Sequence, residues 1–373
     1  MSTRFKVLCV AAARPNFMKI KPVLDALEAR GVATVLIHTG QHFDPQMSEI
    51  FFSDIGLRAP DRNLAISSGT SIGQISRVME AFEPVMLEEV PDAVVVVGDV
   101  NATVACAITA AHRGCVVVHV EAGLRSRDWS MPEEINRVLT DSVSDLLAVP
   151  SSDAADNLRS EGVHEDRIAL VGNVMIDTLF ANLKRAAQLD TIERLGLVSG
   201  NYGVVTLHRP SNVDNAAEFD RLFAILVDVA KEVPLVFPVH PRTKAHLERL
   251  TIPPSITIAE PLGYLDFLCL QRGARLVLTD SGGIQEETTA LGVPCLTLRS
   301  NTERPITITE GTNRLVGTDH EDVVRAAREV LSFGVAPKCP ALWDGHAGDR
   351  IAEAILSRLK NPNGMRPTSL SIQ

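Results

Sequence analysis

The sequence lacks the features expected of a protein that binds nucleic acid or crosses a membrane. Aromatic residues make up only 4% of the 373 residues, and 46 acidic side chains outnumber 36 basic ones, for a net charge of −10. Few aromatic rings leave little surface on which bases could stack, and the acidic balance disfavours binding to polyanions. No stretch approaches the ~20 apolar residues of a membrane span. We therefore expect neither nucleic acid nor a membrane as a partner.

Cysteine is sparse and scattered. The six cysteines form no CxxC pair and lie mostly in or beside apolar runs, which is typical of buried free thiols in a reducing compartment. Arg4 and Lys6 precede an apolar run over Val7–Ala13 that faintly resembles a signal peptide, but a first buried strand explains the run better. We therefore predict a cytoplasmic protein. The cysteines are Cys9, Cys106, Cys115, Cys269, Cys295 and Cys339.

Several motifs of cofactor and metal sites are also missing. No G-x-G-x-x-G follows the first predicted strand and no G-x-x-x-x-G-K-[ST] occurs, so a dinucleotide fingerprint and a P-loop are both absent from the sequence. No HExxH motif occurs, and Gly40 interrupts any helix between His38 and His42. We therefore predict no metal ion and no bound cofactor.

Short apolar runs alternate with longer amphipathic segments in the first half of the chain. The short runs are continuously apolar, as expected of strands buried on both faces, and the order of strand and helix predicts a parallel sheet. The predicted strands are Lys6–Ala12, Ala33–Thr39, Ala93–Gly98, Val116–Val120 and Leu146–Val149. The predicted helices are Lys19–Ala29, Ser71–Glu89, Thr103–Arg113 and Glu133–Ser144.

The same alternation begins again after a polar helical stretch over Asn173–Asn201. The sequence therefore predicts an α/β fold of two doubly wound parallel-sheet domains facing across a cleft. We expect domains at residues 1–172 and 173–348, a helix over 349–360 that packs back on the first domain, and a disordered tail over 361–373. The predicted strands are Gly203–Leu207, Leu235–Val239, Ile256–Ile258, Leu276–Thr279 and Cys295–Leu298. The predicted helices are Ala216–Glu232, Thr243–Leu250, Tyr264–Arg272, Ile284–Leu291 and Asp349–Leu359.

Polar or ionisable residues follow nearly every predicted strand. Ligands of open parallel sheets bind at the carboxyl ends of the strands, so these residues are expected to gather at one edge of each sheet. This convergence is the strongest functional signal that the residues themselves carry. The segments are Arg14–Lys19, Gly40–His42, Gly98–Asn101, Glu121–Arg125, His208–Pro210, His240–Arg242 and Asp280–Gly283.

One of these segments suits an anion. Ser281-Gly282-Gly283 predicts a tight turn that opens a helix, where free N–H groups and the positive end of the helix dipole favour a phosphate. The alternative is a serine that only caps the helix, with glycines needed for packing. Arg14, Arg209 and Arg304 could each add charge-assisted hydrogen bonds, although any one of them could equally form a surface ion pair. Together these residues favour a nucleotide diphosphate as ligand.

Three carboxylates are candidates for proton transfer. Asp99, Glu121 and Glu133 follow or lie near adjacent strand ends, and grouped carboxylates provide an acid beside a base because their charges repel. The alternative is that they only cap helices, above all for Glu133, which follows Pro132. His208 and His240 are candidates for proton transfer or phosphate contact, or for capping the helices that follow.

These motifs, in this order, resemble the non-hydrolysing UDP-N-acetylglucosamine 2-epimerases, which have the GT-B fold. The resemblance runs from about Lys6 to Leu359. In the first half it rests on Ala13–Lys19, Thr39–His42, Gly98-Asp99, His119–Arg125 and Met131–Arg137. In the second half it rests on Val171–Asn173, His208–Asn212, Thr279–Glu287 and Thr302–Pro305.

The resemblance implies interconversion of UDP-N-acetylglucosamine and UDP-N-acetylmannosamine. The C2 proton of such a sugar is not next to a carbonyl group, so simple deprotonation is too costly. Eliminating UDP across C1–C2 gives 2-acetamidoglucal, and UDP can then add back with the proton on the opposite face. This route needs groups that stabilise the departing diphosphate and carboxylates that move protons, and the sequence supplies both.

The resemblance also implies roles for single residues. The catalytic set would be Asp99, Glu121, Glu133 and His208, without an assignment of acid and base. The UDP-sugar would be held by Arg14, Lys19, Arg209, His240, Ser281, Gly282, Gly283, Glu287 and Arg304, with Glu287 on the ribose hydroxyls. The family further implies a homodimer that binds UDP-N-acetylglucosamine, UDP-N-acetylmannosamine and UDP.

The sequence departs from the family pattern in places. Gln41 and His42 match an allosteric site of some members, but Asp44 replaces a second glutamine there, which argues against allostery. Ser126–Ser130 differs from the usual run before Pro-Glu-Glu and is expected to alter the fit of the substrate. Val100 stands where hydrolysing relatives tend to have arginine, and this one residue favours the non-hydrolysing branch. The alternatives left open are a hydrolysing epimerase that releases N-acetylmannosamine and UDP, and a GT-B glycosyltransferase.

Overall fold

The computed structural model describes residues 5–40, 54–66, 69–239 and 241–361. The predicted site residues Gln41, His42 and His240 lie outside the described residues. The chain divides into two compact units, which we call unit 1 (Met1–Thr178 with Ala341–Gln373) and unit 2 (Leu179–Pro340). The division predicted from the sequence lies at residues 172 and 348.

The core of unit 1 is a parallel sheet, seven-stranded in its described part, with the strand order β3-β2-β1-β4-β5-β6-β7. Every pair of neighbouring strands is parallel, and all five residues of both β4 and β5 are buried because helices cover both faces. The strands are β1 (Lys6–Ala11), β2 (Ala33–His38), β3 (Arg62–Asn63), β4 (Ala93–Val97), β5 (Val116–Val120), β6 (Leu146–Val149) and β7 (Ile168–Leu170).

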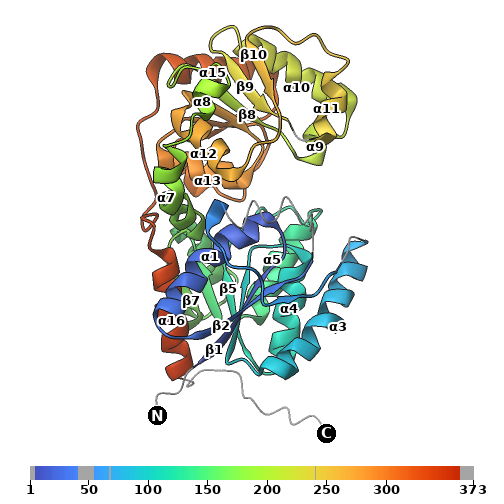
Figure 1. The fold of residues 1–373 in the computed structure, drawn as a ribbon, viewed down its shortest axis with the longest axis vertical. Helices are drawn as coiled ribbons and strands as arrows, with labels where there is room; N and C mark the ends of the chain where they lie inside the picture. The colour runs from blue at the N-terminus through green and yellow to red at the C-terminus, as the bar shows by residue number, and fades with distance from the viewer. Residues whose placement is uncertain (1–4, 41–53, 67–68, 240, 362–373) are drawn as a thin grey trace. The chain divides into compact units, whose positions relative to one another are not determined.

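Two groups of helices cover this sheet (Figure 1). On one face, α16 packs against α1, so that the end of the chain returns to unit 1. On the other face α4 packs between α3 and α5. The helices are α1 (Arg14–Ala29), α3 (Ser71–Glu89), α4 (Asn101–His112), α5 (Pro132–Val143), α6 (Ser152–Ser160) and α16 (Ala347–Lys360), with α7 (Val174–Ala186) leading from unit 1 into unit 2.

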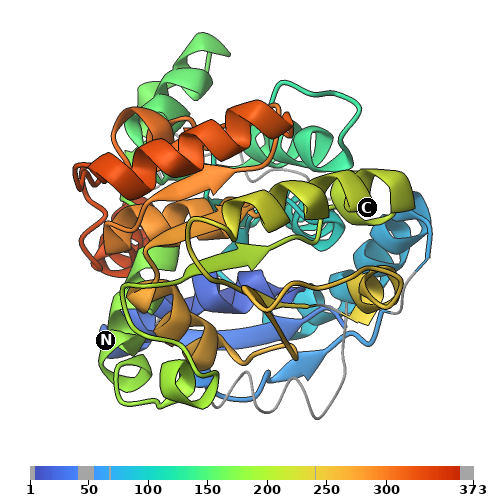
Figure 2. The same cartoon turned by 90° about the horizontal axis from the view of Figure 1, so that it is seen from above.

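Unit 2 repeats the architecture with a parallel sheet, six-stranded where it is described, in the order β10-β9-β8-β11-β12-β13. Adjacent residues of β8 face opposite ways: Val205 packs with α10 and α15, whereas Val204 packs with α12 and α13. Figure 2 shows α10 and α15 side by side on their face. The strands are β8 (Gly203–Thr206), β9 (Leu235–Pro238), β10 (Ile256–Ala259), β11 (Leu276–Thr279), β12 (Cys295–Thr297) and β13 (Asn313–Leu315).

The helices of unit 2 follow the strands in the order of a doubly wound fold. They are α8 (Thr191–Arg194), α9 (Pro210–Val213), α10 (Ala216–Val229), α11 (Pro241–Leu247), α12 (Tyr264–Gly273), α13 (Gly282–Leu291), α14 (Ile306–Thr309) and α15 (His320–Phe333). The predicted α/β class with two doubly wound parallel sheets is thus confirmed. Among the described residues, no helix combines the length and the apolar character that a membrane crossing requires.

Candidate active site

Asp99 and Glu121 leave neighbouring strands at the carboxyl edge of the unit 1 sheet. β4 pairs with β5 in the register Val97↔Val120, and each candidate carboxylate follows within two residues of this pair. The backbone N–H of Gly98 also donates to the carbonyl of Val120 at 3.1 Å, which keeps the two chains together beyond the strands. The strand-end rule therefore places these two predicted residues at the same point of the edge.

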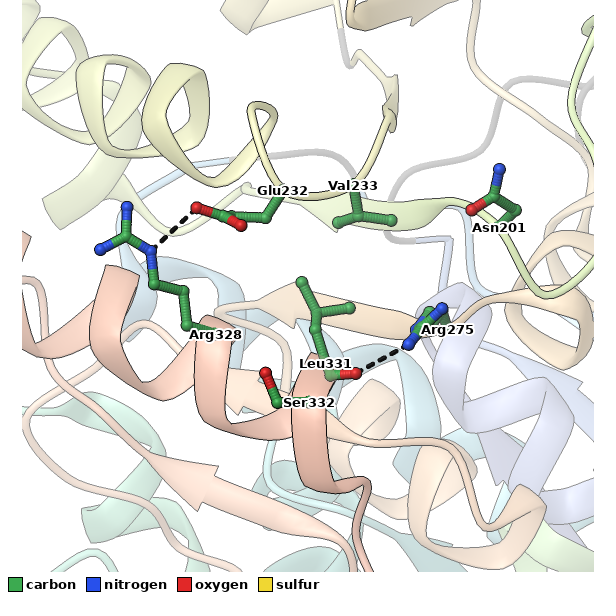
Figure 3. A pocket seen from close by; sticks show the side chains of 7 residues that line it. All are labelled: Asn201, Glu232, Val233, Arg275, Arg328, Leu331 and Ser332. Atoms are coloured by element: carbon green, nitrogen blue, oxygen red, sulfur yellow. Dashed lines mark hydrogen bonds and ion pairs between the residues drawn. The ribbon is translucent and has the colours of Figure 1, made fainter.

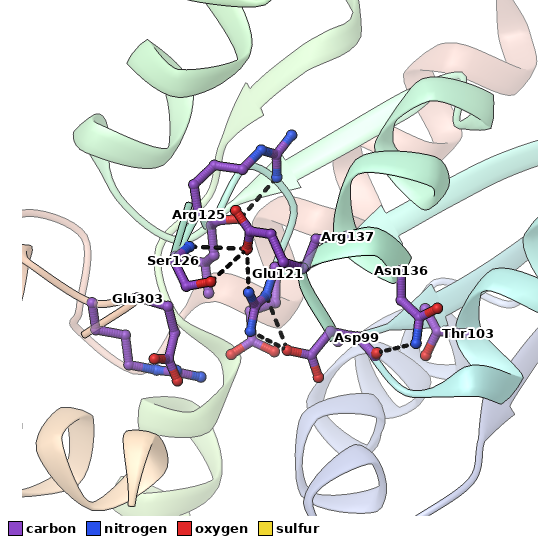
Figure 4. A network of polar contacts seen from close by, with 12 residues as sticks. Asp99, Thr103, Glu121, Arg125, Ser126, Asn136, Arg137 and Glu303 are labelled. Carbon is purple, nitrogen blue, oxygen red and sulfur yellow. Dashed lines mark hydrogen bonds and ion pairs between the residues drawn. The ribbon is translucent and has the colours of Figure 1, made fainter. Parts of the chain in front are cut away.

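Asp99 is held by two residues of α5. The Nη2 and Nε atoms of Arg137 donate to Oδ2 of Asp99 at 2.7 and 3.0 Å, and Nδ2 of Asn136 donates to the backbone carbonyl of Asp99 at 2.9 Å (Figure 4). The Arg137 side chain is buried, whereas that of Asp99 is 31% exposed. Asp99 is therefore an oriented carboxylate that still reaches solvent.

Glu121 has a backbone conformation that is unusual for its residue type. Its φ of +70° lies in the left-handed region, which costs a residue with a Cβ of order 1–3 kcal/mol and is concentrated at functional sites. Its carboxylate forms an ion pair with Lys19 of α1, and both side chains are buried. The structure thus brings two predicted residues together as one pair.

Gly98 makes room for this pair. Its φ of +69° is left-handed, and a Cβ built on it would lie 3.2 Å from Nδ2 of Asn16 and 3.4 Å from Oε2 of Glu121. Nδ2 of Asn16 in turn donates to the carbonyl of Val97 at 3.1 Å. A side chain at position 98 would therefore press on the groups that line the edge between Asp99 and Glu121.

The two neighbouring glutamates at the start of α5 have different environments. Glu133 is exposed in the first turn, whereas Glu134 is buried. Glu134 accepts hydrogen bonds from the backbone N–H groups of Ser126 and Arg127 at 2.9 and 2.8 Å and from Nη1 of Arg137 at 2.5 Å. Burial alone would raise the pKa of Glu134, but these donors hold it below its ordinary value. Glu134 therefore joins the 126–127 segment to the residue that orients Asp99.

Sequence reasoning missed three residues of this network: Glu134, Asn136 and Arg137. They lie within the Met131–Arg137 motif, and the spacing of Glu134 and Arg137 by three residues places both on one face of a helix. That spacing was the available signal, but it does not reveal which strand end the helix faces.

Unit 2 has a corresponding cluster around Asp280, which directly follows β11 and is fully buried. It accepts hydrogen bonds from the backbone N–H groups of His208 and Arg209 at 3.1 and 3.0 Å, and its Oδ1 lies 2.9 Å from Nδ1 of His208. Burial alone would raise the pKa of Asp280, but the His208 ring and the other donors lower it. Asp280 thus fixes the segment after β8 that carries two of the predicted residues.

Three arginines converge on Glu303. The contacts are 2.6 Å from Arg304, 2.9 Å from Arg299 and 3.4 Å from Arg209. Burial alone would raise the pKa of Glu303, but Arg304, Arg299 and Arg209 hold it well below its usual range. Burial also lowers the pKa of Arg209. The cluster therefore keeps two predicted arginines, Arg209 and Arg304, fixed beside a permanent anion.

Arg304 also lies against the start of α13. A Cβ on Gly282 would lie 2.4 Å from Nη1 of Arg304, so glycine is needed for this approach. Nε of Arg304 lies 2.8 Å from Oε1 of Glu286 in the same helix. Ser281, Gly282 and Gly283 thus place helix N–H groups beside a guanidinium, an arrangement that suits a phosphate.

Glu287 is a buried carboxyl group on α13. Burial raises its pKa to about 7, and the neighbouring Glu286 contributes in the same direction, although hydrogen bonds from Gln271 and Tyr264 act against the shift. A carboxyl group in such a place can accept hydrogen bonds from hydroxyl groups of a ligand. This environment is compatible with the ribose contact that the resemblance implies for Glu287.

Other features complete the account of the predicted residues. Arg14 begins α1, and its side chain lies outside the described residues. Within the described part of the chain, no group of three or more histidine, cysteine, aspartate or glutamate side chains could hold a metal ion.

A polar hollow of about 220 Å³ lies in unit 2 beside Asn201, Arg275 and Arg328 (Figure 3). It lies where β8 and β11 begin and includes none of the predicted site residues.

Comparison with known proteins assigns the family. A sequence model of the UDP-N-acetylglucosamine 2-epimerase family matches residues 25–356. The chain belongs to this family. The UDP-N-acetylglucosamine 2-epimerase of Methanocaldococcus jannaschii is 40% identical over 361 residues, which cover 94% of this chain and 98% of the relative. The UDP-2,3-diacetamido-2,3-dideoxy-D-glucuronate 2-epimerase of Pseudomonas aeruginosa is also 40% identical, over 93% of this chain and 98% of the relative.

A solved structure of an epimerase gives the same result for the fold. The crystal structure of the Methanocaldococcus jannaschii UDP-GlcNAc 2-epimerase in complex with UDP-GlcNAc and UDP has a TM-score of 0.87 to this chain, at 40% sequence identity. The similarity covers 95% of this chain and all of the other. The resemblance based on strand-end motifs is therefore confirmed at the level of the epimerase family and its GT-B fold.

Proposed function

We propose that this protein interconverts UDP-N-acetylglucosamine and UDP-N-acetylmannosamine by elimination and re-addition of UDP. The observation that carries the proposal is the arrangement of Asp99 and Glu121 at adjacent strand ends, where Asp99 pairs with the buried Arg137 and Glu121 with the buried Lys19. Two separately held carboxyl groups can exchange protons with two faces of a sugar. A protein that only bound a nucleotide sugar would have no evident use for such a pair.

In the proposed reaction, one carboxylate takes the proton from C2 while the bond between C1 and the diphosphate oxygen breaks. The C2–H electron pair forms the C1=C2 double bond of 2-acetamidoglucal, and UDP leaves with the electron pair of the broken bond. A second acid then delivers a proton to the other face of C2, and UDP adds back at C1. Positioned acid and base groups typically contribute about 10²–10⁴-fold to such steps.

Unit 2 supplies the groups that would hold the leaving diphosphate. Arg304, Arg209 and the start of α13 at Ser281 provide guanidinium and helix N–H donors, which strengthen as negative charge develops on the leaving group. The ring and the backbone N–H of His208 both bind Asp280, which also binds the backbone N–H of Arg209. We assign the proton transfers to Asp99, Glu121 and Glu133 of unit 1 and the binding of the diphosphate to unit 2.

A second candidate substrate is a UDP-linked 2,3-diacetamido uronate. The observation that favours it is the Pseudomonas aeruginosa relative, which matches this chain with the same 40% identity as the Methanocaldococcus enzyme. The chemistry at C1 and C2 would be unchanged, because the two sugars differ at C3 and C6. The choice between them is a matter of fit around the sugar.

The deciding experiment is incubation with each UDP-sugar in D2O, followed by NMR of the sugar. We expect deuterium at C2 and a mixture of both epimers, still linked to UDP. Accumulation of free N-acetylmannosamine and UDP would assign a hydrolysing epimerase instead. Turnover that requires an acceptor, without exchange at C2, would assign a glycosyltransferase.

The assembly and the control of the enzyme are proposed on the same resemblance. We propose a homodimer in the cytoplasm, for which light scattering should give a mass of twice 40.3 kDa. We propose that Gln41 and His42 do not form a functional allosteric site, because Asp44 replaces the second glutamine. Initial rates should then rise hyperbolically with UDP-N-acetylglucosamine, and a sigmoidal curve would show that the site is retained.

A further inference from the structure

His119 is a buried histidine to which the proposed chemistry gives no role. It is the fourth residue of β5, and its side chain has no solvent exposure. Its Nδ1 lies 2.6 Å from Oδ1 of Asp141, and its Nε2 lies 2.8 Å from the backbone carbonyl oxygen of Gly98. The ring therefore spans from β5 to α5 and to the segment after β4.

The two partners determine how the ring is held. The Gly98 carbonyl can only accept, so Nε2 must carry a proton. Oδ2 of Asp141 already accepts from the backbone N–H of Gly123 at 3.1 Å and lies 2.8 Å from Nη1 of Arg125. Burial alone would raise the pKa of Asp141, but His119 and Arg125 lower it, and the other oxygen, Oδ1, faces Nδ1 of the ring within hydrogen-bond distance.

A compact set of charges surrounds this ring. Asp141 lies between the ring and the buried guanidinium of Arg125, which in turn binds the partly exposed Glu161 at 2.7 Å. Asp141 is therefore held both by the ring and by a buried cation on its other side.

One end of the ring determines the position of Asp99. The Gly98 carbonyl belongs to the peptide group that leads directly into Asp99, and Gly98 itself has a left-handed φ of +69°. Asn136 holds the carbonyl on the other side of Asp99, and Arg137 holds its carboxylate. His119 thus supplies a further anchor for the segment that carries Asp99.

The other end of the ring acts on the turn that carries Glu121. Asp141 accepts the N–H of Gly123, two residues after Glu121, while the N–H of Glu121 itself donates to the carbonyl of Ala148 at 3.1 Å. These bonds hold the turn in which Glu121 keeps its φ of +70°. The ring of His119 is therefore linked to both strand ends that carry candidate carboxylates.

We propose that His119 is a positioning residue that holds the Gly98–Asp99 peptide and, through Asp141, the Glu121 turn in the geometry needed for proton transfer at C2. This inference rests on the proposed epimerase function. It predicts that loss of the bond to Gly98 slows the chemical step without weakening the binding of the substrate.

A matched pair of variants tests the proposal. In His119→Gln the amide nitrogen can occupy the place of Nε2 and keep the bond to Gly98, whereas in His119→Asn it can occupy the place of Nδ1 and keep only the bond to Asp141. Each variant loses one buried hydrogen bond, so the midpoint temperature of thermal unfolding should fall to a similar extent in both. We expect His119→Asn to lower kcat for C2 exchange about 100-fold and His119→Gln less than about tenfold, with KM changed less than about threefold in each.

Equal kcat values for the two variants, or a change mainly in KM, would overturn the proposal. Absence of C2 exchange in the wild-type enzyme would instead contradict the proposed function, so the two failures are distinguishable. If neither His119 variant folds, Asp141→Asn provides the test, because its amide can keep every hydrogen bond by donating to Nδ1 and accepting from Gly123 and Arg125. We expect that variant to keep kcat within about threefold, and a larger loss would contradict positioning through these bonds.

Discussion

The two sheet edges of this protein share one topology but present opposite chemistry. At the edge of unit 1, Asp99 pairs with Arg137 and Glu121 with Lys19, and Glu121 has a left-handed backbone. At the edge of unit 2, Arg209 and Arg304 share one carboxylate, Glu303, beside the start of a helix. In the proposed function, the first edge moves protons and the second holds an anion. The difference shows that the doubly wound fold supplies the place of a site, whereas the residues at the strand ends determine its chemistry.

The largest predicted effect tests whether unit 1 performs the proton transfers. Replacing Asp99 by Asn keeps the shape of the side chain and removes its ability to take a proton. We expect C2 exchange to fall about 1000-fold, equivalent to about 4 kcal/mol, with UDP affinity within about twofold of wild type. Exchange is measured by NMR in D2O and affinity by calorimetry. Asp156→Asn, an exposed change on α6, is the control that should leave both unchanged, and undiminished turnover of Asp99→Asn would remove Asp99 from the mechanism.

The next effect concerns Glu287 in unit 2. Burial raises the pKa of this carboxyl group to about 7. Between its ordinary pKa of 4.5 and about 7, the folded protein holds a proton that the unfolded chain has lost. The free energy of unfolding should therefore decrease as pH rises through this window and level off above it.

Glu287→Gln removes this titration. At about pH 8 we expect it to make the ligand-free protein about 3 kcal/mol more stable than wild type, with little difference at about pH 4. Urea unfolding at the two pH values measures both. Glu260→Gln, an exposed change in the same unit, is the control. A stability difference for Glu287→Gln that does not vary with pH would contradict the ionisation of this group on unfolding.

A smaller effect tests whether unit 2 holds the diphosphate. Arg304→Gln removes a guanidinium that lies against the start of α13. Because charge-assisted hydrogen bonds contribute about 1.5–3 kcal/mol, UDP affinity should fall about 10–100-fold, as measured by calorimetry. Arg314→Gln removes an exposed ion pair with Glu329 and should leave UDP affinity unchanged. Equal UDP affinity in the two variants would show that Arg304 does not bind the diphosphate.

The smallest effect separates backbone strain from crowding at the edge of unit 1. Gly98 and Gly31 both have left-handed φ values, but a Cβ on Gly31 would meet nothing within 4 Å. Gly→Ala at either position should lower the free energy of unfolding by about 1 kcal/mol. Only Gly98→Ala should also slow C2 exchange, by about tenfold, because its methyl group would press on Asn16 and Glu121. Equal exchange rates in the two variants would show that the edge tolerates the methyl group.

Long buried strands were predictable from the sequence because a continuous run of apolar residues is usually buried in a folded protein. β5 was predicted at its exact bounds and β4 within one residue. The short strands β3, β7 and β13 were missed, since two or three residues at or near the end of a sheet carry no distinctive pattern. Their existence depends on a neighbouring strand that offers hydrogen bonds.

In the candidate site, too, some residues were predictable from the sequence and others were not. Asp99 and Glu121 were found because they directly follow strands, and the chain itself dictates that position. Arg137 was missed because its role arises from the packing of α5 against Asp99, 38 positions away in the sequence. Glu134 was missed because the Ser126–Arg127 segment that it binds is irregular and carries no pattern that predicts the contact. The pairing of Lys19 with Glu121 joins residues 102 positions apart, and no local pattern predicts such a contact.

The sequence by itself determined which apolar runs are buried, in what order most strands and helices follow, and which polar groups stand at the ends of the predicted strands. These properties are local, because hydrophobic periodicity and chain direction act over a few residues. Only the tertiary structure decided which cation pairs with which carboxylate, that Glu121 takes a left-handed backbone, and that His119 joins Gly98 to Asp141. Those outcomes depend on distances between separate elements, which packing of the whole unit establishes.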